Sequence, residues 1–124
     1  KNFGKVVFIV FTGLGATGTS TFTVEACDDT TPTNHPAIPF HYRSYEDSDI
    51  PGHVMAADAT GFTNTAGSNR IHVIEVDAEA LIASGYSYVR LVATEVVNDP
   101  VLGGILVLQL DPKATELVGA TTLT

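Results

Sequence analysis

The stretch that decides the fold is Thr21–Cys27, which reads TFTVEAC. Its apolar residues Phe22, Val24 and Ala26 alternate with polar or charged ones, so they share one face of an extended segment. This two-residue period predicts a strand that has one face on a core and the other in solvent.

Similar segments lie on both sides of this stretch, separated by short runs of turn-forming residues. The further predicted strands are Gly4–Thr12, Ile38–Tyr45, Val54–Ala57, Arg70–Val76, Tyr86–Val97 and Gly103–Leu110. Thr, Val and Ile supply 37 of the 124 residues, and β-branched side chains suit a pleated sheet better than a helix. We therefore predict an all-β fold, an antiparallel β-sandwich of jelly-roll type with seven or eight strands.

One short helix is expected within this pattern. Asp77 is a suitable N-cap, Ala78–Ala83 forms one or two helical turns, and Gly85 ends them. The strand that follows, Tyr86–Val97, is the longest candidate, and we expect a bend or bulge in its middle.

The chain length predicts one domain. Residues 1–110 form the sandwich, and the Thr-rich residues 111–124 form a C-terminal arm. Lys1 is not an initiator methionine, so we expect a missing leading segment or a processed terminus, and no signal-peptide pattern is visible. The longest apolar run, Val6–Phe11, is too short for a membrane span.

Composition limits the partners. The chain is 44% hydrophobic and 16% charged, which excludes a generic disordered segment. Its formal net charge of −8 disfavours a nucleic-acid partner. A single cysteine excludes an intrachain disulfide framework.

Residues 13–18 read GLGATG and match the glycine pattern of dinucleotide sites. That chemistry needs a helix whose N-terminus meets the pyrophosphate. The residues that follow, TSTFTV, are strand-like, so we interpret the glycines as a hairpin turn.

Reactive side chains are present without a recognisable arrangement. The histidines are His35, His41, His53 and His72, and the serines considered as nucleophiles are Ser20, Ser44, Ser68 and Ser84. The histidines form no close metal-binding pair, and the serines lack a nucleophile-elbow context. Cys27 precedes two aspartates, which disfavour its thiolate, so we interpret it as structural. We predict no enzyme, no metal and no cofactor.

Loop carboxylates and aromatic residues leave two possibilities open. The acidic clusters Asp28-Asp29 and Glu46–Asp49 are interpreted as solvated loops, and Ca²⁺ binding by either stays open. Phe40 and Tyr42 share a face on either side of His41 and are expected in the core or at a contact. The chain has no tryptophan, which disfavours a sugar-binding platform without excluding it.

The first and last predicted strands are apolar on both faces. A two-layer sandwich has one dry face per strand, so the surplus predicts contact with another subunit. The predicted interface residues are Val6, Phe8, Val10, Ile105, Val107, Leu108 and Leu110.

The order of the segments resembles a protein family. The segments that carry the resemblance are FTVEACDD (22–29), AIPFHYR (37–43), IEVDAEAL (74–81), GYSYVRL (85–91) and GGILVL (103–108), after the opening strand GKVVFIV (4–10). Over residues 4–110 this layout resembles small virion proteins encoded near the head genes of tailed bacteriophages and prophages. These motifs are structural, so the resemblance transfers no catalytic residue.

The resemblance implies a capsid cement or decoration subunit of jelly-roll or related fold. Such a subunit is made in the host cytoplasm, forms a dimer or trimer, and binds the major capsid protein on the outer capsid surface. The alternative is a carbohydrate- or receptor-binding sandwich of a phage tail or fibre. Its site would lie in the loops Asp28–Pro36, Glu46–Gly52 and Asp58–Asn69.

Overall fold

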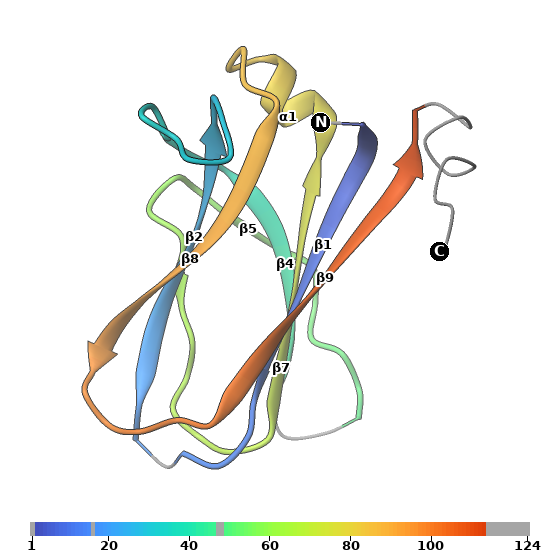
Figure 1. Ribbon diagram of the computed structural model, residues 1–124. Helices are drawn as coiled ribbons and strands as arrows, with labels where there is room; N and C mark the ends of the chain where they lie inside the picture. The colour runs from blue at the N-terminus through green and yellow to red at the C-terminus, as the bar shows by residue number, and fades with distance from the viewer. Residues whose placement is uncertain (1, 16, 47–48, 114–124) are drawn as a thin grey trace, which may run out of the picture.

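The computed structural model describes residues 2–15, 17–46 and 49–113. Within these ranges the chain forms two antiparallel β-sheets that pack against each other, together with one short helix (Figure 1). The predicted all-β sandwich is therefore confirmed, while the jelly-roll connectivity stays a prediction.

The larger sheet has the strand order β5-β4-β7-β1-β9. Its strands are β5 (Met55–Ala57), β4 (Phe40–Tyr45), β7 (Arg70–Asp77), β1 (Phe3–Thr12) and β9 (Gly103–Pro112). β1 pairs with β7 on one side and with β9 on the other. The first strand therefore has a ladder partner on each side.

The smaller sheet is built around β2 (Thr19–Cys27). β8 (Tyr88–Val97) pairs along all of β2, whereas β3 (Ala37–Ile38) and β6 (Phe62–Thr63) each pair with a short part of it. β8 and β9 follow each other in the chain but belong to different sheets, and a turn at one end of the sandwich joins them (Figure 1).

The core lies between the sheets and follows the predicted alternation. β2 contributes Phe22, Val24 and Ala26, the residues that the sequence pattern places on one face. The other buried members of the core are Phe8, Val10, Ile38, Phe40, Ala57, Ile74 and Val76. Val24, Ala26 and Ile74 are completely inaccessible to solvent.

Pro39 divides what the sequence predicts as one strand, Ile38–Tyr45. Ile38 pairs with β2 in the smaller sheet, whereas Phe40 pairs with β5 in the larger sheet. The chain therefore crosses between the layers at a residue that has no N–H to donate to a ladder. The apolar alternation continues through the crossing because both pieces face the same core.

The helix α1 (Ala78–Ile82) lies at the expected place and is one residue shorter than predicted. Asp77 is at the N-cap position, but its side chain makes no capping hydrogen bond; its carboxylate lies 3.5 Å from Lys5 Nζ. Gly85, with φ of 77°, ends the helix as predicted, and Tyr86 N–H donates to Leu81 O.

The last two strands also differ from the sequence prediction. β8 begins at Tyr88, and its register shift lies at the far end, opposite Thr19 and Ser20, and not in its middle. β9 runs to Pro112, so Asp111 and Pro112 belong to the sandwich and not to an arm. The rest of the predicted arm, 114–124, lies outside the described residues.

The glycine-rich stretch 13–18 precedes the strand β2, which begins at Thr19, as expected; Ala16 lies outside the described residues. The predicted hairpin turn is wrong, because β1 and β2 belong to different sheets and do not pair with each other. A Cβ on Gly18 would lie 2.5 Å from the carbonyl oxygen of Asp99. Close packing against the β8–β9 turn thus accounts for this glycine.

Candidate assembly surface

β9 is exposed along its whole length. Ile105 and Val107 lie beside Val10 and Phe8 of β1 and therefore face the core side, whereas Leu106 and Leu108 face outward. The exposed fractions of Ile105, Leu106, Val107, Leu108 and Leu110 are 53%, 57%, 49%, 38% and 41%. Both faces of this strand thus present large apolar side chains to solvent.

The backbone of β9 also has a free side. Among residues 2–15, 17–46 and 49–113, β9 pairs only with β1, and the register is constant from Gly103 to Leu110. An edge strand leaves a row of N–H and C=O groups available for another strand. β9 therefore combines unpaired backbone groups with apolar side chains.

The structure separates the seven predicted interface residues into two groups. Phe8 and Val10 are only 5% and 4% exposed and belong to the core, and Val6 packs half-buried against it. The inner face of β1 is covered by this chain's own second sheet, so these residues are not available to a partner. Ile105, Val107, Leu108 and Leu110 remain accessible, and their role as contacts stays a prediction.

The outward residues of β9 continue across the neighbouring strands. Leu106 lies beside Ile9 of β1, which lies beside Val73 of β7. Phe11 is next in line on β1 and is 46% exposed. We call this row on the outside of the larger sheet, Leu106, Leu108, Ile9, Phe11 and Val73, the outer apolar face.

The gap between β8 and β9 is incompletely filled. A hollow of about 310 Å³ there is lined by Val6, Phe8, Val89, Arg90, Leu91, Ile105, Val107 and Gln109. The sandwich is therefore open on the side where its last two strands form the edges.

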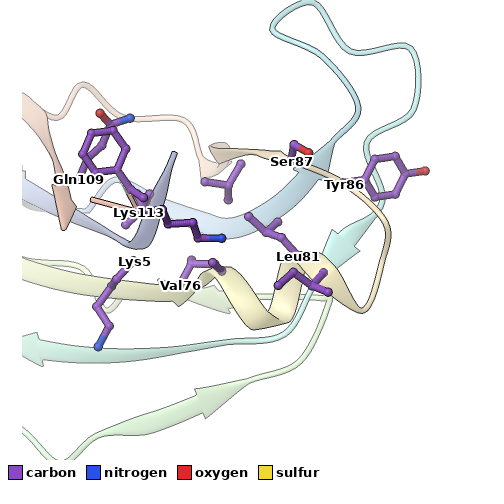
Figure 2. A pocket seen from close by; sticks show the side chains of 12 residues that line it. Lys5, Val76, Leu81, Tyr86, Ser87, Gln109 and Lys113 are labelled. Carbon is purple, nitrogen blue, oxygen red and sulfur yellow. The ribbon is translucent and has the colours of Figure 1, made fainter. Parts of the chain in front are cut away.

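A smaller hollow of about 100 Å³ adjoins the first, because Val6, Val89 and Gln109 line both (Figure 2). Figure 2 shows the side chain of Lys113 extending into this space above Val76 and Leu81, whereas Lys5 points away. The Lys5 ammonium donates to the Glu75 carboxylate, and this hydrogen bond raises the pKa of Lys5.

An aromatic cluster joins the two sheets at the opposite side of the sandwich. Phe62 of β6 stacks on Tyr42 of β4, with ring centroids 3.8 Å apart and an angle of 2° between the planes. Phe22, Phe40 and His72 also contact Phe62, at centroid separations of 5.4 to 6.1 Å. The prediction of an exposed loop over Asp58–Asn69 is therefore wrong for Phe62, and the signal in the sequence is an aromatic residue directly after Gly61.

An open hollow of about 440 Å³ borders this cluster. Its lining combines the aromatic residues Tyr42 and Phe62 with the polar or titratable residues Ser44, Glu46 and His53. A concave surface of this mixed character can accept a small polar molecule that has one apolar face.

His72 is the most deeply buried titratable residue of this region, with no exposed surface. Ser44 Oγ lies 2.8 Å from His72 Nδ1, whereas Nε2 has no hydrogen-bond partner among the described residues. Burial lowers the pKa of His72. A serine–histidine pair can serve nucleophilic catalysis, but this imidazole packs against Phe22 and Phe62 and is closed to substrate.

The other candidate reactive residues do not converge on one site. His35 Nδ1 lies 3.2 Å from Glu25, and His41 and His53 are exposed. Cys27 is 2% exposed, and its burial raises the pKa of the thiol. In the part of the chain that the structure describes, His, Cys, Asp and Glu form no group suited to hold a metal ion.

Carboxylates of the two acidic clusters make contacts within the chain. Asp28 accepts hydrogen bonds from the backbone and side chain of Asn34; burial acts to raise its pKa, but these bonds outweigh it and the net pKa is lowered. Glu46 lies 3.1 Å from the buried guanidinium of Arg70. Residues 47 and 48 of the second acidic cluster lie outside the described ranges.

Among the residues described, no helix has the length and apolar character that crossing a membrane requires. Comparison of the chain with protein-family models, with curated proteins and with solved structures gave no match.

Proposed function

We propose that this chain is a structural protein of a tailed-phage virion, a capsid cement or decoration subunit that bridges neighbouring capsomers from the outside. The observation that carries the proposal is β9, a ten-residue edge strand whose apolar side chains are exposed on both faces. Soluble proteins normally shorten, charge or cover such an edge. An edge left in this state is suited to contact with another polypeptide.

The outer apolar face and the charge support the same role. The outer apolar face extends the exposed surface of β9 across three strands, which suits the major capsid protein as a broad and shallow partner. A subunit on the outside of the shell makes no contact with packaged DNA, so a net charge of −8 is compatible with this location. Weak contacts repeated around a shell become strong through multivalency.

The test is the composition of the particle. Virions of the phage or induced lysogen that carries the coding sequence are purified, heads are separated from tails, and their proteins are quantified by mass spectrometry. We expect this chain in the head fraction, in a fixed ratio to the major capsid protein. Heads from a deletion strain should release DNA at a lower temperature, and complementation should restore the wild-type value. Absence of the chain from purified particles would refute the proposal.

The hollow beside Tyr42 and Phe62 favours one second candidate, a carbohydrate- or receptor-binding module of a tail or fibre. Its aromatic faces and polar rim match the groups that bind sugars. Glycan-array binding that is lost on Tyr42→Ala, together with mass-spectrometric detection in tails, would support this function. An array without binding, both in Ca²⁺ and in chelator, would reject it.

A further inference from the structure

We propose that β9 pairs antiparallel with β9 of a second copy of this chain, about a twofold axis through Val107. The two larger sheets then join into one sheet of ten strands. This inference goes beyond the virion role and does not depend on it, because it follows from the edge itself.

The two long edges of the sandwich differ in how they are protected. β8 carries Arg90 and Glu95, and its register is interrupted opposite Thr19 and Ser20. Charges and bulges of this kind discourage pairing with another chain. From Gly103 to Leu110, β9 has no charge, no proline and a constant register. β9 is therefore the edge that accepts a strand.

The ends of β9 limit the register. Asp111 has a φ of 54°, which departs from extended backbone, and Pro112 has no N–H to donate. A twofold axis at Val107 pairs Gly103 with the partner copy's residue 111 and leaves Pro112 outside the ladder. An axis one pleat further along, at Leu108, would bring Pro112 into it.

This register is also self-complementary. Val107 lies opposite its own copy, Leu106 opposite residue 108, and Ile105 opposite residue 109. Each pair is on a common face, because residues directly opposite each other in an antiparallel ladder project from the same side of the sheet. Asp111, the only charged residue of β9, meets a glycine and not a second carboxylate.

The geometry limits this association to two copies. The other edge of the larger sheet is β5, which has only three residues. An isologous contact through β9 uses the long unprotected edge that the described strands leave in each copy, so pairing closes and does not continue into a fibre.

The available area predicts a weak dimer. Aliphatic residues expose about 170–200 Å² each when free, so the fractions on β9 allow at most on the order of 450 Å² of apolar surface to be buried per chain, or about 900 Å² for two. This is near the lower limit of about 1,000–1,200 Å² for specific interfaces. We therefore expect dissociation in the micromolar range in solution.

The test uses the full chain at about 1–200 μM in sedimentation velocity, which covers the expected micromolar range. We expect a monomer–dimer equilibrium. Val107→Lys places two ammonium groups opposite each other and should leave the monomer at all concentrations. The matched control is Val96→Lys on the other long edge, where Val96 is 57% exposed; it should dimerise like the wild type. Circular dichroism and melting curves confirm that both variants fold.

Cysteine cross-linking tests the register. In a Cys27→Ala background, Val107→Cys should form a disulfide-linked dimer under mild oxidation. Ile105→Cys alone should not, because its partner position is 109, but a mixture of Ile105→Cys and Gln109→Cys chains should.

Three outcomes would overturn the proposal. These are a wild type that is monomeric at 200 μM, a dimer that Val107→Lys leaves intact, and cross-linking of Ile105→Cys with itself but not of Val107→Cys. If the wild type is monomeric and a chain ending at Lys113 dimerises, residues 114–124 are the occupant of the edge instead. Because purified chain is used, failure here leaves the particle-composition test of the virion role unaffected.

Discussion

Replacing Gly61 by alanine should destabilise the fold far more than the same change at Gly85. The two residues have nearly equal φ values of 78° and 77°, so alanine suffers the same left-handed strain at both, about 1–2 kcal/mol. They differ in their surroundings. A Cβ on Gly85 meets nothing within 4 Å, whereas on Gly61 it would lie 2.0 Å from the carbonyl oxygen of Phe22.

The clash at Gly61 requires β6 to move away from β2 by more than 1 Å, which disrupts the pairing of Phe62 with Phe22. Overpacking of this kind costs about 1–3 kcal/mol. Together with the strain, we expect Gly61→Ala to lower the free energy of unfolding by about 2–5 kcal/mol and Gly85→Ala by about 1–2 kcal/mol.

Urea denaturation followed by circular dichroism measures the difference. With an m value of roughly 2 kcal/mol/M, the urea midpoint should fall by about 1–2.5 M for Gly61→Ala and by about 0.5–1 M for Gly85→Ala. Protein concentration is held constant, because self-association would stabilise the folded state. Equal shifts for the two variants would refute the close approach of β6 to β2, and with it the position of Phe62.

Three further predictions concern the interior. Phe62→Ala should lower the free energy of unfolding, measured in urea, by about 3 kcal/mol because burial and ring contacts are lost. Phe11→Ala is the control at a site that is 46% exposed, and it should lower the free energy of unfolding by less than about 1 kcal/mol. Similar losses for the two variants would contradict the aromatic cluster. Because the pKa of His72 is lowered in the folded chain, the unfolded chain binds a proton at a higher pH than the folded chain does. The free energy of unfolding should therefore fall as the pH drops below about 6.5, the ordinary histidine pKa. His72→Gln should flatten this pH profile between pH 6.5 and 5, and an unchanged slope would assign the pH dependence to other groups. The buried Cys27 thiol, with its raised pKa, should react with a disulfide reagent at pH 8 far more slowly in the native chain than in urea; equal rates would show that β2 opens at that end.

The alternation of apolar and polar residues predicts which side chains are buried where a strand has one face on the core. Phe22, Val24 and Ala26 are buried as their spacing predicts, and Gly85 ends the helix where its backbone freedom is needed. These features depend on neighbours in sequence, which a sequence pattern records.

Features that depend on distant residues were not predictable in this way. The chain crosses between the two sheets at Pro39. The alternation of Ile38, Phe40 and Tyr42 does not reveal this crossing, because one continuous strand and two strands that face a common core give the same pattern. Phe62 joins the core through contacts with residues 20 to 40 positions away, so its local polar context misled the assignment. The apolar faces of β1 and β9 look alike in sequence, and only the strand order makes one central and the other an edge.

The strand order also determines when the larger sheet can form during synthesis of the chain. β1 leaves the ribosome before its two ladder partners, β7 and β9, which are encoded more than 55 and 90 residues later. The larger sheet therefore cannot be completed until β9 has been translated, and pairings this far apart in sequence make folding slow. Because β9 follows the other described strands in the chain, its exposed edge is completed only when those strands are already available to hold it, which limits premature association between nascent chains on one messenger.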